Sequence, residues 1–125
     1  MSGAFYSNLS AERWFSLSIV GQMANIGSDV VRAARFRDRD PERAWAALSR
    51  ALELFELTLR DPKNRSLCPL QELCRAKEFF VGAFLGCSEF ASLDDMVRYF
   101  DFFAWAYARE RERASQQGAP GPAAS

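Results

Sequence analysis

Apolar residues recur at spacings of three and four along four stretches of the chain, which is the period of an amphipathic helix. No stretch alternates apolar and polar residues as a strand does, and β-branched residues are few. The connections between the four stretches are short, which favours antiparallel neighbours. We therefore expect an all-α fold, a single-domain, up-down antiparallel four-helix bundle over residues 10–115, with helices at about 11–36, 41–60, 69–86 and 93–114.

Recognisable start and stop residues bound these helices. Ser10 can cap the first, and Asp40-Pro41-Glu42 joins a capping Asp, a Pro at the first helical position and an acid in the first turn. Pro62 ends the second helix, and Pro69 begins the third. Gly86 is a C-terminal stop and Ser92 a cap for the fourth helix. These signals predict where the chain turns.

Two of the helices show an apolar seam that predicts the core. In the first helix the seam consists of Phe15, Ile19, Met23, Ile26, Val30 and Ala33. In the second helix it consists of Trp45, Leu48, Leu52, Phe55 and Leu59. Outside the helices, residues 1–9 form an N-terminal segment, and the uncharged, Pro- and Gly-rich residues 116–125 predict a disordered tail.

The fourth helix is apolar nearly all round, which a terminal helix of a small monomer should not be. Its aromatic residues outside the core face are Tyr99, Phe102 and Trp105. Exposed aromatic residues among Arg are typical of the core of an interface, so we expect a homo-oligomer, most simply a two-fold dimer. The alternative is that Phe5 and Tyr6 of the N-terminal segment cover these residues.

Lys77 falls within the apolar sector of the third helix, where an ammonium group needs a partner. It pairs with a carboxylate such as Glu53 or Glu56, extends its tip to water, or serves as a cation in a cleft. The small polar residues of the first helix form either a seam against another helix or the floor of a binding groove. The residues of this candidate polar cleft are Asn25, Asp29, Arg32, Glu53, Arg75, Lys77 and Glu78.

Charge and composition limit the partners of the 125-residue chain. Its 16 Lys and Arg balance its 16 Asp and Glu, which argues against a surface-wide field for nucleic acid. Fourteen of the cations are Arg, whose planar fork suits phosphate. The candidate phosphate contacts are Arg35, Arg37, Arg39, Arg60, Lys63 and Arg65. Solvated turns are the alternative interpretation of these clusters.

Several chemistries lack the residues they need. The chain has no His, so the usual general base and the commonest metal ligand are absent, as are the common nucleotide-binding loops. Its three Cys have no CxxC spacing and indicate reduced thiols in a cytoplasmic protein. We see no secretory signal and no membrane span. We expect no cofactor, no metal and no catalytic residue.

Several segments resemble a group of small uncharacterised helical proteins from bacteria and archaea. The residues concerned are Gly21-Gln-Met-Ala-Asn-Ile-Gly-Ser-Asp29, the run 50–63, Arg75-Ala-Lys-Glu78, Phe84-Leu-Gly86 and Tyr99-Phe100. The resemblance covers roughly residues 12–110 and implies a compact helical domain with no assigned activity. Cys87-Ser88-Glu89 departs in part from the turn expected after the glycine, and such proteins lack a run like Arg32–Arg39.

The sequence thus favours a non-catalytic scaffold or accessory protein that acts through self-association and binding of a protein partner. Two alternatives stay open. One is a nucleic-acid-associated accessory subunit that uses the Arg clusters, and the other is a small-anion binder or enzyme centred on Lys77.

Overall fold

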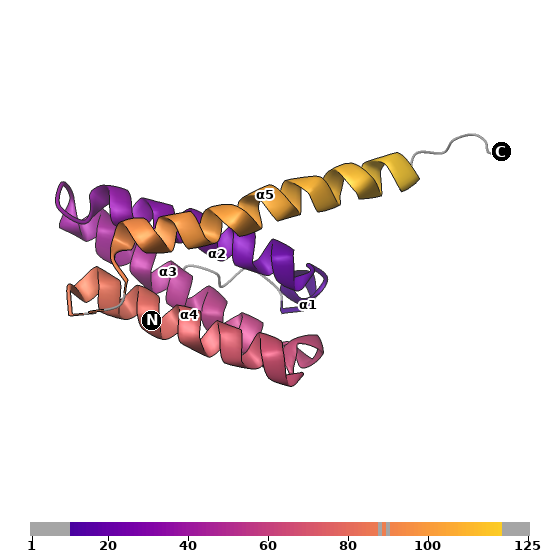
Figure 1. The fold of residues 1–125 in the computed structure, drawn as a ribbon, viewed down its shortest axis with the longest axis horizontal. Helices are drawn as coiled ribbons and strands as arrows, with labels where there is room; N and C mark the ends of the chain where they lie inside the picture. The colour runs from indigo at the N-terminus through magenta and orange to yellow at the C-terminus, as the bar shows by residue number, and fades with distance from the viewer. Residues whose placement is uncertain (1–10, 88, 90, 119–125) are drawn as a thin grey trace.

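The computed structural model describes residues 11–87, 89 and 91–118, and over these residues the fold is all-helical, without a strand (Figure 1). The elements in chain order are α1 (Ala11–Phe15), α2 (Ile19–Phe36), α3 (Pro41–Arg60), the 3-10 helix η2 (Pro62–Asn64), α4 (Leu67–Leu85) and α5 (Leu93–Gly118). The prediction of an all-α fold is confirmed. The predicted cap Ser10 and the covering residues Phe5 and Tyr6 lie outside the described residues.

The first predicted helix is two helices, because the chain turns at residues 16–18. The Ser16 hydroxyl donates to the carbonyl oxygen of Arg13 at 2.6 Å, and the Ser18 hydroxyl accepts from the backbone N–H of Gly21 at 3.0 Å. Serine hydroxyls compete in this way with backbone hydrogen bonds of a continuing helix. Ser18 therefore caps α2, and the prediction of one continuous helix over 11–36 is wrong.

The predicted bounds of α3 are confirmed, and those of α4 shift slightly. Asp40 caps α3 by accepting from the Arg43 N–H at 3.3 Å. Helix α4 begins at Leu67, two residues before Pro69, which is tolerated in the first turn because no intrahelical donor is needed there. It ends at Leu85, and its C-cap Gly86 has a φ of 75°, the left-handed conformation that glycine adopts without strain.

Helix α5 begins with a reciprocal cap. The Asp95 N–H donates to the Ser92 hydroxyl at 3.1 Å, and the Ser92 N–H donates to the Asp95 carboxylate at 3.0 Å. These bonds hold the pKa of Asp95 below its usual value. The helix continues to Gly118, so residues 116–118 are helical and not part of a disordered tail, whereas 119–125 lie outside the described residues.

Helix α2 packs along both α3 and α5, while α4 contacts α3 and α5 less extensively (Figure 1). The core takes large side chains from every long helix, and the most buried are Met23, Ile26, Phe55, Leu73, Phe80 and Phe100. Most of the predicted seams lie in this core. Trp45 does not: it is 52% exposed and meets Phe84 edge-on at 5.2 Å between ring centroids. The buried stripe of α3 begins at Ala44, Ala47 and Leu48, and Trp45 lies at the edge of that stripe.

Two glycines of α2 permit its close approach to α5. A Cβ atom at Gly27 would lie 2.9 Å from the Cβ of Phe100, and one at Gly21 would lie 2.8 Å from Cε1 of Tyr107. Real Cβ atoms essentially never come so close. The small-residue face of α2 is therefore part of the α2–α5 contact.

A buried polar network joins α1, α2, α3 and η2. The Gln22 amide donates to the Asp61 carboxylate at 2.8 Å and to the carbonyl oxygen of Trp14 at 3.1 Å. The Asn64 amide donates to the Gln22 side-chain oxygen at 2.9 Å, and the Trp14 indole N–H donates to the Thr58 hydroxyl at 3.0 Å. Gln22, Thr58, Asp61 and Asn64 are each at most 2% exposed. The bonds among these buried groups offset the cost of removing them from water.

Candidate interaction surface

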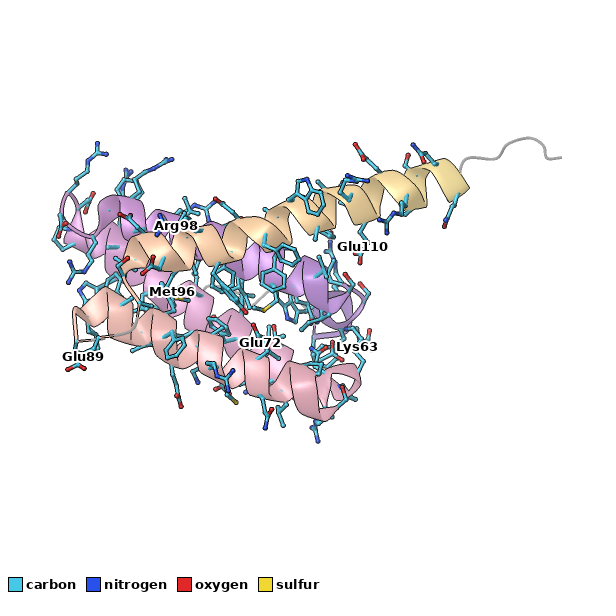
Figure 2. All side chains as sticks on the ribbon, in the orientation of Figure 1. Lys63, Glu72, Glu89, Met96, Arg98 and Glu110 are labelled. Carbon is cyan, nitrogen blue, oxygen red and sulfur yellow. The ribbon has the colours of Figure 1, made fainter. Side chains whose placement is uncertain are left out.

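One face of helix α5 packs against the rest of the fold, and the opposite face is exposed. Met96 and Phe100 are buried against the rest of the fold, and Tyr107 lies over Gly21. Near the start of α2, the Ser18 hydroxyl donates to the carboxylate of Glu110 at 2.6 Å, where Figure 2 shows Glu110 pointing towards α2. Beyond this contact residues 111–117 are all exposed, and Figure 1 shows the end of α5 projecting past α2.

The opposite face carries two aromatic residues, Phe102 and Trp105, which we name the α5 patch. Each is 59% exposed, and their ring centroids lie 6.5 Å apart. The Arg109 guanidinium lies 5.3 Å from the Trp105 ring centroid, within the range of a cation–π contact. Spacings of three and four place Arg98, Phe102, Trp105 and Arg109 in one row along the helix. Aromatic residues beside Arg are the composition of interface hot spots.

Tyr99 was predicted with the α5 patch but lies in a different environment. It is half-buried, its hydroxyl donates to the Glu72 carboxylate of α4, and its ring meets Phe100 and Phe103 edge-on. Burial first, and the hydrogen bond to Glu72 second, raise the pKa of Tyr99 well above its usual value. Tyr99 therefore joins α4 to α5, where these helices border a groove of about 300 Å³.

The residues of the predicted polar cleft lie at several separate contacts. Buried Asp29 accepts from Arg32 at 2.9 Å and from Arg50 of α3 at 3.3 Å. Lys77 pairs with Glu56 at 3.2 Å, which joins α4 to α3. The remaining members are Asn25, which is exposed and donates to the Gly21 carbonyl oxygen, half-buried Glu53, and the exposed Arg75 and Glu78 of α4. The contacts among described residues give Asp29 and Lys77 different partners rather than a shared one.

The candidate phosphate contacts lie in two groups at opposite ends of α3. Those before α3 are Arg35, Arg37 and Arg39, and those near its end are Arg60, Lys63 and Arg65. A helix of 20 residues is about 30 Å long, so the groups do not form one continuous basic surface. Arg37 and Lys63 are engaged locally, since Arg37 donates to the Phe84 carbonyl oxygen and Lys63 to the Asp61 carboxylate.

Sequence reasoning missed the network of Gln22, Asp61 and Asn64. In the sequence Gln22 lies on the polar sector of its helix and Asp61 is a helix stop, while their partners lie about 40 residues apart. Burial raises the pKa of Asp61, but hydrogen bonds from Lys63 and Gln22 outweigh it and hold the pKa below its usual value. The network is a structural junction in which the carboxylate is charged.

Neither metal ligation nor a membrane span is indicated within the described part of the chain. No group of three or more Cys, Asp and Glu side chains there is arranged to hold a metal ion. No helix there has both the length and the apolar character to cross a bilayer. Cys74 and Cys87 are exposed free thiols.

Comparison with protein-family models, with curated proteins and with solved structures finds no match to this chain. The resemblance to small helical proteins of bacteria and archaea thus stays a prediction.

Proposed function

We propose that the protein is a non-catalytic scaffold or accessory protein that forms a homodimer through the α5 patch. The observation that carries the proposal is the exposure of Phe102 and Trp105, each 59% open to water on the face of α5 opposite the buried Met96 and Phe100. Large apolar groups that lie together on a surface indicate a binding site. A dimer would cover both side chains in each copy.

The up-down arrangement of four antiparallel helices belongs to the same proposal. Its support is that α2 packs on α3 and α5, and that successive long helices run in alternate directions in Figure 1. Such a scaffold would leave the outer face of α5 available for a partner. A cytoplasmic location completes the proposal, supported by the free thiols of Cys74 and Cys87.

The experiment is sedimentation equilibrium on the unaltered chain and on the double variant Phe102→Glu with Trp105→Glu. Buried carboxylates without partners are strongly unfavourable, so the double variant should be a folded monomer. Trp truncations at hot spots cost about 2 kcal/mol or more, which corresponds to a loss of affinity of about thirtyfold or more.

Trp45→Glu is the matched control, since Trp45 is also an exposed tryptophan, 52% open, but lies on α3. It should leave the dimer intact, while circular dichroism verifies that every variant is helical. An unaltered dimer in the Phe102 and Trp105 double variant would contradict the proposal. A monomeric unaltered chain would also contradict it and would direct attention to a different protein as the partner.

A further inference from the structure

We infer that the second copy docks on the α5 patch in antiparallel orientation, with the two-fold axis close to Trp105. This inference rests on the proposed function and adds the direction and register of the contact. Its basis is the distribution of charge on the two sides of the α5 patch, together with the projecting end of α5.

The exposed face of α5 is acidic before the α5 patch and basic after it. Towards the N-terminus three carboxylates lie with one guanidinium, and the residues are Asp94, Asp95, Arg98 and Asp101. Towards the C-terminus two guanidinium groups lie with one carboxylate, and the residues are Arg109, Glu112 and Arg113. An antiparallel copy places the acidic half of one helix opposite the basic half of the other.

Among the described residues, the ion pairs within α5 leave some of these charges unpaired. Asp95 pairs with Arg98, and Arg109 pairs with Glu112 at 4.0 Å. Among the described residues, by contrast, none forms an ion pair with Asp94, Asp101 or Arg113. These charges are available for a second chain, two on the acidic side and one on the basic side.

One register brings opposite charges together on both sides of the α5 patch. With the axis at Trp105, residues four positions away in either direction face each other, so Asp101 meets Arg109 of the partner subunit. Seven positions away, Arg98 meets Glu112 of the partner subunit by the same rule. The two-fold axis doubles each pair. Trp105 then packs on its symmetry copy, with the two Phe102 rings on either side.

Other arrangements bring like charges together. A parallel pair places every residue opposite its own copy, so the acidic halves face each other. An antiparallel pair centred midway between Phe102 and Trp105 places Arg98 opposite Arg109. Like charges across an interface suppress the wrong arrangement.

The projecting end of α5 fits the same orientation. Residues 111–117 are exposed, and none of the described helices covers them (Figure 1). A helix segment without tertiary packing is marginally stable in water. In the antiparallel dimer this end lies along the first turns of the partner's α5, which gives it a packing surface.

The test is a charge exchange between Asp101 and Arg109, with dimer dissociation constants measured by sedimentation at low ionic strength. The single variants Asp101→Arg and Arg109→Asp should each weaken the dimer about tenfold, because symmetry converts two attractive pairs into two repulsive ones. The double variant restores opposite charges and should recover most of the lost affinity. Glu42→Arg, at an exposed position of α3, is the control and should leave the dissociation constant unchanged.

The outcomes separate this inference from the proposal on which it rests. A dimeric unaltered chain whose double variant is as weak as the single variants, or weaker, overturns the antiparallel register and leaves the dimer standing. Single variants with unchanged affinity overturn it as well. A monomeric unaltered chain overturns the proposed function and this inference together.

Discussion

At the scale of single residues, the Asp61 side chain links the first two helices to the end of α3. It ends α3, caps η2 by accepting from the Lys63 N–H at 3.1 Å, and accepts from Gln22 of α2. Lys63 also donates to the Phe15 carbonyl oxygen at 2.9 Å, so α1 is anchored at the same point. The Asp61 carboxylate and its partner Lys63 thus connect the turn after α1 to the turn after α3.

The first prediction concerns the pH dependence of stability. Because the pKa of Asp61 is lower in the folded state than its ordinary 3.8, the unfolded chain binds the proton more readily. The stabilisation is therefore complete above about pH 5 and is lost as the pH falls through 3.8 towards the folded-state value. Asp61→Asn should lower the free energy of unfolding at neutral pH by about 1–3 kcal/mol and flatten its fall in acid.

Urea unfolding at several pH values from neutral to acid measures both effects. Asp38→Asn is the control, since the Asp38 side chain is 87% exposed. Equal acid sensitivity of the Asp61→Asn variant and the unaltered chain would contradict the role given to Asp61.

The second prediction concerns Lys77. Its side chain is 32% exposed and its partner Glu56 is 52% exposed, so their ion pair is largely hydrated. Such exposed ion pairs contribute between zero and about 1 kcal/mol to the free energy of unfolding. Lys77→Met should change the free energy of unfolding by no more than about 0.5 kcal/mol in either direction, measured by urea unfolding. A loss of several times that size would show a role for the ammonium group that this pair does not explain.

The sequence predicted the burial of individual side chains well where the apolar stripe of their own helix determines it. Met23, Ile26, Val30 and Phe55 lie in the core because each falls on an apolar stripe. Gln22 and Asp29 are buried although each lies on a polar stripe. Their partners come from other elements, and no periodicity within one helix can indicate a partner 21 to 42 residues away.

At the level of the helices, the contact of α2 with α5 depends on two glycines, which have no side chain. Gly21 and Gly27 let aromatic residues of α5 lie directly on the backbone of α2. Glycine within a helix lowers stability by about 1 kcal/mol relative to alanine. The close packing of α2 on α5 therefore has to offset this cost at both glycines.

The third prediction contrasts these two glycines. At Gly27 the added methyl group meets the Cβ of Phe100, which is fixed to the backbone of α5, so the helices themselves must move apart. At Gly21 it meets the ring of Tyr107, which can rotate. Gly27→Ala should lower the free energy of unfolding by about 1–2 kcal/mol, whereas Gly21→Ala should be close to neutral, as the gain in helix propensity offsets the contact. Thermal unfolding measures both, and equal effects of the two substitutions would contradict this account of the packing.

The helix ends were predictable where a local hydrogen bond determines them. Asp40, Gly86 and Ser92 act where their residue types predict. The break at residues 16–18 was not predictable, because Ser-Leu-Ser interrupts no apolar period and its effect depends on which hydroxyl bonds the backbone. The prediction ended the last helix too early, because Arg, Glu and Gln can continue a helix that has no apolar face.

At the scale of the whole molecule, most large apolar side chains of the described residues pack in the core, and Phe102 and Trp105 are the most exposed of the large apolar side chains there. The predicted interface divides accordingly: Tyr99 joins α4 to α5, while Phe102 and Trp105 stay exposed. The sequence indicated that α5 has more apolar surface than a monomer needs. It could not assign each aromatic residue to the inside or the outside, since that depends on how α4 crosses α5.

The most direct test of this account is the solution mass of the unaltered chain, measured by light scattering over a range of micromolar concentrations. Burial of Phe102 and Trp105 in a two-fold contact predicts a mass of twice 14.1 kDa that falls on dilution. A mass of 14.1 kDa at every concentration would contradict self-association through α5.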